Sequence, residues 1–173
     1  MLHRVLGGMF VIAACGGGGI LFGRQMKLRQ EHLQEGRRAV ELLQAQIRTE
    51  GGSLPEALRE TGEHMAGVYG ELFREISEEM LLYRGEPVRV LWEEAARRKL
   101  RQSYLQPSDV EQFVLLGEQL GMTDRQMQET ILGRYLSYTE NELSVLLGEI
   151  REKTRLYRNL GILLGIFLTI LLL

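Results

Sequence analysis

Apolar residues are concentrated at the two ends of the 173-residue chain. Residues 5–23 are 19 positions without a charge, and the final 14 residues, 160–173, are also uncharged. A helix of 19 residues is roughly 28 Å long, close to the thickness of the hydrocarbon layer of a membrane. The second segment is short, but Tyr157 at the interface and Arg158 reaching toward water can lengthen its usable span. The pattern therefore predicts one membrane helix at each end.

Between these ends the apolar residues recur at helical spacing, and no stretch alternates as a β-strand does. The first helix is predicted to end at the "GG" that precedes "SLPE". In "SLPE", Ser53 is the predicted N-cap of the second helix and Glu56 takes the capping-box position. The stretch "RGEP", residues 84–87, separates a third helix from a fourth. Ser108 and Glu111 are predicted to form the capping box of the fifth helix.

The stretch "LLGEQLGMTDRQMQ", residues 115–128, predicts a tight turn between the fifth and sixth helices. Gly121 is expected to end the fifth helix in a left-handed conformation. Thr123 then caps the sixth helix, and Asp124 adds negative charge at its N-terminus. Gly117, one turn earlier, is expected to let another helix approach closely. The predicted fold is all-α: an antiparallel six-helix bundle whose long first and last helices continue into the membrane helices.

Charge divides the chain in the same way. Five basic residues lie within 24–38 and four within 151–158, whereas residues 39–150 carry 11 basic and 20 acidic side chains, a net charge of −9. Basic flanks on the inner side of both apolar segments place the body in the cytoplasm and both termini outside. The acidic body argues against nucleic-acid binding. The predicted division is an N-terminal transmembrane helix, a cytoplasmic helical bundle and a C-terminal transmembrane helix, at residues 1–23, 24–158 and 159–173.

Cys15 raises an alternative for the first segment. It follows Ile12-Ala13-Ala14, the small-residue pattern that precedes the lipidated cysteine of bacterial lipoproteins. The residues after Cys15 are apolar and then basic, whereas a lipoprotein has a polar tether there. We therefore expect a retained membrane helix. A membrane-tethered lipoprotein with an extracytoplasmic helical domain stays open as the alternative.

Each apolar segment also contains a GxxxG pair. Gly19 and Gly23 form the first, and Gly161 and Gly165 form the second. Small residues at this spacing let membrane helices pack closely. The four glycines are therefore candidates for packing between membrane helices, with a simple anchor that tolerates glycine as an equal alternative.

The sequence gives little support for catalysis. His3, His32 and His64 are far apart and show no metal-ligand spacing. The glycine run at 16–19 lacks the Lys-Ser/Thr that follows in a phosphate-binding loop. We therefore expect no enzyme activity, no cofactor and no metal. An enzyme that uses the interior of the bundle is a third hypothesis, and it requires a deep pocket with converging polar groups.

The pattern LG-x-x-LG-x-x-D-x-x-x-Q is the most specific motif of the chain. It comprises Leu116-Gly117, Leu120-Gly121, Asp124 and Gln128. Together with "SLPEALRE" and the C-terminal "LYRNLGILLGIFLTILLL", it resembles the stage III sporulation protein AB family of endospore-forming bacteria. The resemblance covers essentially the whole chain and makes Gly117, Gly121, Asp124 and Gln128 candidates for a structural or partner-binding motif.

The resemblance implies a function. Members of this family belong to a secretion-like channel between mother cell and forespore, and are related in fold to the inner-membrane F protein of type II secretion. It implies a multi-pass protein of the mother-cell membrane around the forespore, acting as a scaffold or adaptor. The implied partners are a cytoplasmic AAA-type ATPase, the stage III sporulation AA type, other channel proteins and membrane lipid. Homo-oligomer formation is left open.

Overall fold

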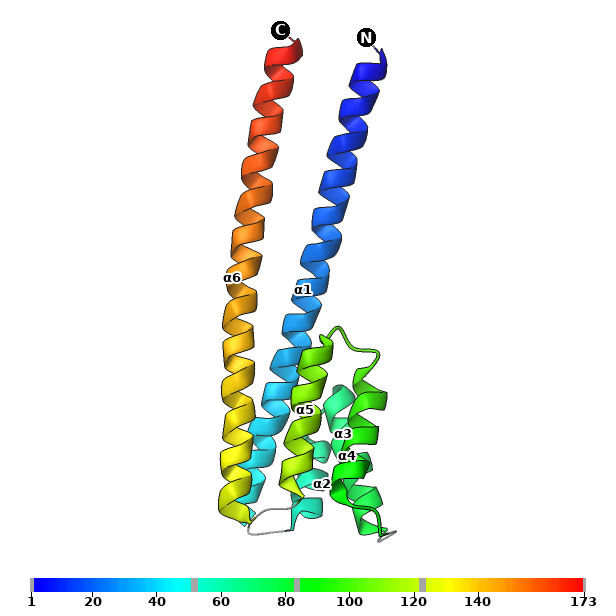
Figure 1. The fold of residues 1–173 in the computed structure, drawn as a ribbon, viewed down its shortest axis with the longest axis vertical. Helices are drawn as coiled ribbons and strands as arrows, with labels where there is room; N and C mark the ends of the chain where they lie inside the picture. Colours follow the sequence, from blue (N-terminus) through cyan, green and yellow to red (C-terminus); the bar gives the residue numbers. More distant parts are fainter. Residues whose placement is uncertain (1, 51–52, 83–84, 122–123, 173) are drawn as a thin grey trace. The chain divides into compact units, whose positions relative to one another are not determined.

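The computed structural model describes residues 2–50, 53–82, 85–121 and 124–172. Side chains at 2–22, at 49–50, 125 and 154, and at most of 157–172 lie outside this description. The described residues form six helices and no strand, which confirms the predicted all-α bundle (Figure 1). The helices are α1 (Leu2–Glu50), α2 (Leu54–His64), α3 (Gly67–Leu81), α4 (Val88–Leu100), α5 (Pro107–Leu120) and α6 (Arg125–Leu172).

The chain divides into two compact units. One unit, Arg29–Leu143, contains α2 to α5 and the adjoining parts of α1 and α6, and is called the bundle below. The other unit consists of the outer parts of α1 and α6, Met1–Leu28 and Ser144–Leu173. Within the described part of the chain, no helix combines the length and the hydropathy of a membrane span.

Aromatic side chains from four helices form the centre of the bundle core. Trp92 of α4 stacks on Phe113 of α5 at 5.2 Å between ring centroids, and Phe73 of α3 lies 5.6 Å from the indole. Tyr135 of α6 contacts Phe113 edge-on at 5.7 Å. Such ring pairs add to the stability that burial of their area provides. Phe113 is thus the point at which α4, α5 and α6 meet.

Two helix starts test the capping predictions. The carboxylate of Glu56 accepts hydrogen bonds from the backbone N–H of Ser53 at 2.8 Å and from its hydroxyl at 3.0 Å, which confirms Ser53 as the N-cap of α2. The prediction of Ser108 as the next cap is wrong, because Gln106 is the N-cap of α5 and Pro107 is its first residue. Proline favours that position because its fixed φ suits a helix and its missing N–H would have no partner there.

The left-handed conformation predicted for Gly121 is also wrong. Its backbone has φ −75° and ψ −12°, which is right-handed. Glycine is required there for space instead, since a Cβ at this position would lie 2.8 Å from Cβ of Val88, at the start of α4. Thr123, the predicted cap of α6, lies outside the described residues. Asp124 caps this helix, because its Oδ1 accepts a hydrogen bond from the backbone N–H of Met127 at 2.9 Å.

Candidate functional site

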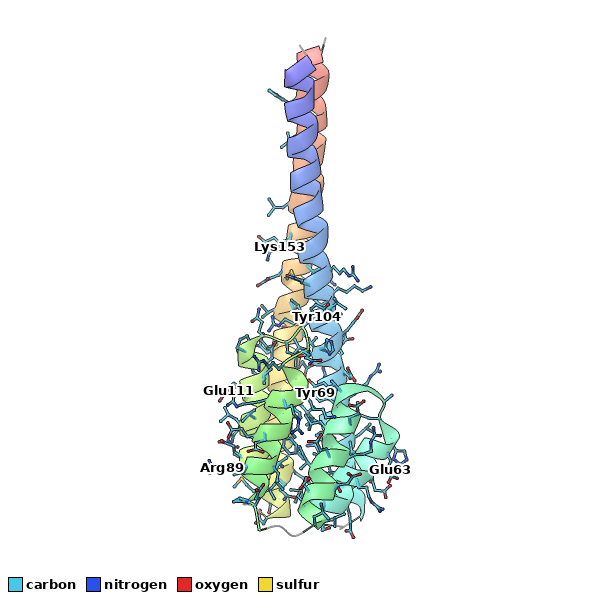
Figure 2. All side chains as sticks on the ribbon, turned by 90° about the vertical axis from the view of Figure 1, so that its right-hand side faces the viewer. Glu63, Tyr69, Arg89, Tyr104, Glu111 and Lys153 are labelled. Carbon is cyan, nitrogen blue, oxygen red and sulfur yellow. The ribbon has the colours of Figure 1, made fainter. Side chains whose placement is uncertain are left out.

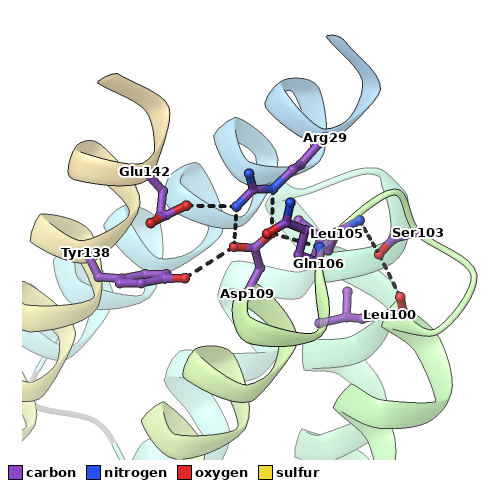
Figure 3. A network of polar contacts seen from close by, with 8 residues as sticks. All are labelled: Arg29, Leu100, Ser103, Leu105, Gln106, Asp109, Tyr138 and Glu142. Atoms are coloured by element: carbon purple, nitrogen blue, oxygen red, sulfur yellow. Dashed lines mark hydrogen bonds and ion pairs between the residues drawn. The ribbon is translucent and has the colours of Figure 1, made fainter. Parts of the chain in front are cut away.

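Contacts at three levels along helix α5 hold it in the bundle. The first level, at the start of the helix, is a buried polar cluster. Its side chains are Arg29, Asp109, Tyr138 and Glu142, called the Asp109 cluster (Figure 3). Arg29 of α1 donates from Nε and Nη2 to the two carboxylate oxygens of Asp109, each at 2.8 Å. The same Nη2 donates to Glu142 of α6 at 2.8 Å. One guanidinium therefore joins α1, α5 and α6.

The electrostatics of the Asp109 cluster follow from its burial. The side chain of Asp109 is 1% exposed and that of Arg29 is 12% exposed. Hydrogen bonding to Asp109 is the main cause that raises the pKa of Arg29 above its ordinary value, against the opposing effect of desolvation. Tyr138 donates from its hydroxyl to Asp109 at 3.2 Å, and the backbone N–H of Gln106 donates at 2.8 Å. A bidentate ion pair with these additional donors satisfies a charge that would be costly to bury alone.

Tyr138 makes the stability of the bundle sensitive to high pH. Burial, followed by the charges of Asp109 and Glu142, raises its pKa from 10.0 to about 12. Because the folded pKa exceeds the unfolded one, this contribution is complete below pH 10 and is lost as the pH rises toward 12. We expect the free energy of unfolding, measured with denaturant, to fall across this range. In the Tyr138→Phe variant, the free energy of unfolding should fall less steeply with pH. A pH dependence as steep as that of the unsubstituted protein would contradict the assignment to Tyr138.

The second level lies at the middle of α5, where Gly117 meets Trp92. A Cβ at position 117 would overlap the indole ring, so the close approach predicted at this glycine is present. The indole Nε1 donates to the backbone carbonyl of Phe113, one turn earlier in α5, at 2.9 Å. The indole of Trp92 therefore packs directly against the backbone of α5 at Gly117 and donates a hydrogen bond to that backbone. As a result, α4 and α5 approach more closely than a side chain at position 117 would allow.

The third level is the turn between α5 and α6, which contains the rest of the motif. Gln128 donates from Nε2 to the backbone carbonyl of Leu120 at 3.0 Å. That carbonyl belongs to the last turn of α5, where helix geometry leaves acceptors without a partner. With Asp124 as the cap of α6 and Gly121 against Val88, all four motif residues take part in contacts of α5 and α6. The motif builds this corner of the bundle, and its role in partner binding stays a prediction.

Substitution of Asp124 separates these two roles. Asparagine caps a helix nearly as well as aspartate, so Asp124→Asn should keep the stability of the bundle. Asp124→Ala should lower the free energy of unfolding by about 1 kcal/mol. Thermal unfolding followed by circular dichroism measures both. If the capping role is the whole role, Asp124→Asn also keeps its partners on co-purification; a folded Asp124→Asn protein that loses them would assign the carboxylate to an interface.

The described residues give no binding or catalytic role to the other candidates from the sequence. Within the described residues, no group of three or more His, Cys, Asp or Glu side chains could hold a metal ion. An open groove of about 470 Å³ lies between α1 and the α2–α3 connection, with Glu35, Arg38 and His64 among its lining residues. It lacks the enclosure that the enzyme hypothesis requires. Open space surrounds Gly23. The surroundings of Gly19, Gly161 and Gly165 lie outside the description.

The Asp109 cluster was not predicted from the sequence. Arg29 was recognised only as one of the basic residues after the first apolar segment. Its partners are 80 and 113 residues away, beyond the reach of helical spacing. The available signal was Asp109 itself, an acidic residue two positions after a proline that starts a helix.

Comparisons with known proteins agree with the motif. The family profile "Stage III sporulation protein AB" matches residues 4–173. Among solved structures, one titled "Stage III sporulation protein AB" is similar with a TM-score of 0.63 and 21% sequence identity, over 72% of this chain and 97% of that chain. At 21% sequence identity, this similarity shows a shared fold alone. A comparison with curated proteins gave no match. Because the profile spans nearly the entire chain, the protein belongs to the stage III sporulation protein AB family.

Proposed function

We propose that this protein is a membrane-anchored adaptor in the channel between mother cell and forespore, and that it couples a cytoplasmic AAA-type ATPase to the membrane assembly. The observation that carries the proposal is the family match over residues 4–173, which assigns the chain to sporulation and includes both apolar segments. The adaptor role, the channel and the ATPase come from the family resemblance. The organisation of the bundle around α5 is in keeping with a scaffold.

Membrane anchoring rests on the sequence. A helix of the 19 uncharged residues 5–23 matches the hydrocarbon thickness of a membrane. Basic residues lie on the inner side of both apolar segments, and they favour a cytoplasmic bundle. Alkaline phosphatase, active only outside the cytoplasm, tests this when fused after residue 30 or after residue 173. Activity only after residue 173 supports the adaptor. Activity after residue 30 would overturn the cytoplasmic placement and favour the lipoprotein alternative, in which Cys15 is lipidated.

The acidic surface of the bundle is proposed to dock a basic surface of the ATPase. Glu78 and Glu94 are exposed on α3 and α4, two helices that pack against each other, and Glu79 and Glu93 are their neighbours in sequence. Opposite charge speeds encounter and suppresses wrong partners more than it sets affinity. Replacing all four residues with Gln should therefore lower the association rate of the intact protein in nanodiscs with the ATPase. The same rate should fall as the Debye length shrinks from about 10 Å at 0.1 M salt to about 3 Å at 1 M.

A matched control is available on α1. Glu41 is exposed and pairs with Arg37 on its own helix, so Glu41→Gln changes charge away from α3 and α4. It should leave the association rate nearly unchanged. An association rate that responds neither to salt nor to the four substitutions would reject electrostatic docking and leave shape and apolar contacts as the basis of assembly.

A further inference from the structure

The groove between α1 and the α2–α3 connection has a fixed wall opposite α1. This wall is the extended backbone of Met65 and Ala66. The carbonyl of Met65 packs so closely on Gly70 that a Cβ there would overlap it. Arg74 of α3 holds the end of α2, because its Nη1 donates to the carbonyl of Gly62 at 2.8 Å. The groove is therefore preformed, and its volume of about 470 Å³ lies in the range of binding pockets.

One charge in the groove has no partner. The carboxylate of Glu35 lies against Gly67, which has a φ of +85°, and 3.8 Å from Nδ1 of His32. The carboxylate of Glu31 is also engaged. Arg38 is exposed, and its guanidinium forms no hydrogen bond or ion pair within the part of the chain that the structure describes. Arg38 is therefore the charge that a docked segment would find free.

An exposed leucine follows Arg38 by one helical turn. Leu42 also lines the groove, and its side chain is 39% exposed. Residues four apart lie on the same face of a helix, so the arginine and the leucine share one side of α1. Met65 adds apolar surface from the opposite wall. The groove thus combines an apolar surface with a positive charge one turn before it.

The end of α3 carries the complementary pair. Leu82 is 56% exposed, the largest value among the large apolar side chains described in the bundle. Glu78 lies one turn earlier, since its carbonyl accepts from the N–H of Leu82 at 3.1 Å. Glu78 is exposed, and its carboxylate has no hydrogen bond or ion pair with any residue that the structure describes. The exposed Leu115 differs, because Glu111, one turn before it, is paired with Arg97.

We infer that the end of α3 of one copy of this chain docks in the groove of a second copy. Leu82 then packs on Leu42 and Met65. Glu78 then pairs with Arg38. In both helices the charge precedes the leucine by one turn, about 6 Å, so both contacts form when α3 of one copy and α1 of the other align in the same direction. Apolar burial supplies the affinity, and the charge pair sets the register.

The groove and the end of α3 are different surfaces of one bundle. Figure 2 shows Glu63, next to His64 of the groove, and Arg89, just after the α3–α4 turn, on opposite sides of the bundle. Because α3 is packed in its own core, its end can reach only the groove of another copy. A contact between unlike surfaces repeats from copy to copy, and builds a ring if the rotation closes. Glu78 is also part of the proposed ATPase surface, so the test below contains no ATPase.

The test measures self-association of the full-length protein in detergent micelles by sedimentation velocity at increasing protein concentration. Arg38→Glu places two carboxylates opposite each other and should weaken self-association by more than about tenfold. Glu78→Arg should do the same with two cations. An equimolar mixture of the two variants should associate like the unsubstituted protein, because every groove then meets an end of α3 with the opposite charge. Leu82→Ser should weaken association about tenfold, and no mixture with a charge variant should restore it fully.

A matched control is Arg134→Glu, an equal change of charge at an exposed position of α6, which should leave self-association unchanged. Association that persists in both single charge variants assigns the contact to the terminal segments and overturns the inference. Charge variants that stay dissociated in the mixture also overturn it, and restoration in the mixture shows that both variants are folded. A protein that is monomeric at every concentration overturns the inference and leaves the groove to a different protein.

Discussion

Asp109→Ala should be among the most damaging single substitutions in the bundle, lowering the free energy of unfolding by about 3–5 kcal/mol. The substitution removes both acceptors of the Arg29 fork and leaves that partly buried guanidinium with Glu142 alone. It also removes the acceptor for the Gln106 N–H at the start of α5. Chemical denaturation of the purified protein, followed by circular dichroism, measures the loss.

An ion pair at the surface gives the control for Asp109. Glu41→Ala breaks the exposed pair with Arg37 on α1 and should cost less than about 1 kcal/mol. The double substitution of Arg29→Met with Asp109→Ala should cost less than the sum of the two single changes, because it removes the buried charge together with its partner. Additive losses would show that Arg29 and Asp109 do not act as a pair.

Gly117→Ala is the second substitution with a large expected effect. The added methyl group would overlap the indole of Trp92, so either the ring or α5 must move, and the hydrogen bond from Trp92 to Phe113 is strained. Overpacking of this kind costs about 1–3 kcal/mol, and we expect the upper end of that range because the neighbour is a fully buried ring. Thermal unfolding should show a correspondingly lower midpoint.

A glycine-to-alanine substitution at another position should raise the free energy of unfolding instead of lowering it. Gly133 lies within α6, and a Cβ there would meet only Nε2 of Gln44, at an ordinary distance of 3.9 Å. Gly133→Ala should therefore stabilise the bundle by about 0.5–1 kcal/mol, because alanine loses less backbone entropy in a helix. If both substitutions stabilised the protein, the close packing of Trp92 on α5 would be disproved.

Local sequence signals identified the helices well. Ser53 and Glu56 form the predicted cap of α2, because capping is decided within a few residues. Another helix approaches Gly117 closely, as expected, but which helix it is was not predicted. Errors arose where two local signals competed. At the start of α5, Ser108 has the residue type of an N-cap, but the preference of Pro107 for the first helical position puts the cap two residues earlier, at Gln106.

Tertiary contacts explain what local signals could not supply. Gly121 looked like a left-handed helix end, yet the reason for glycine is the position of Val88, more than thirty residues earlier in the chain. Arg29 looked like a membrane flank residue, yet its guanidinium lies inside the bundle. In both cases the partner comes from a different helix, and spacing along one helix carries no information about it.

The Asp109 cluster gives the bundle a defined mechanical behaviour. Arg29 and Glu142 lie at or next to the ends of the bundle segment of α1 and α6, so a force that slides these two helices past each other acts on their contact. Sliding α1 past α6 by one helical turn is a displacement of about 5.4 Å, which no 2.8 Å contact survives. The Arg29 contacts must therefore break before the helices can shear. The bundle should transmit small forces as a rigid body and yield abruptly at larger ones.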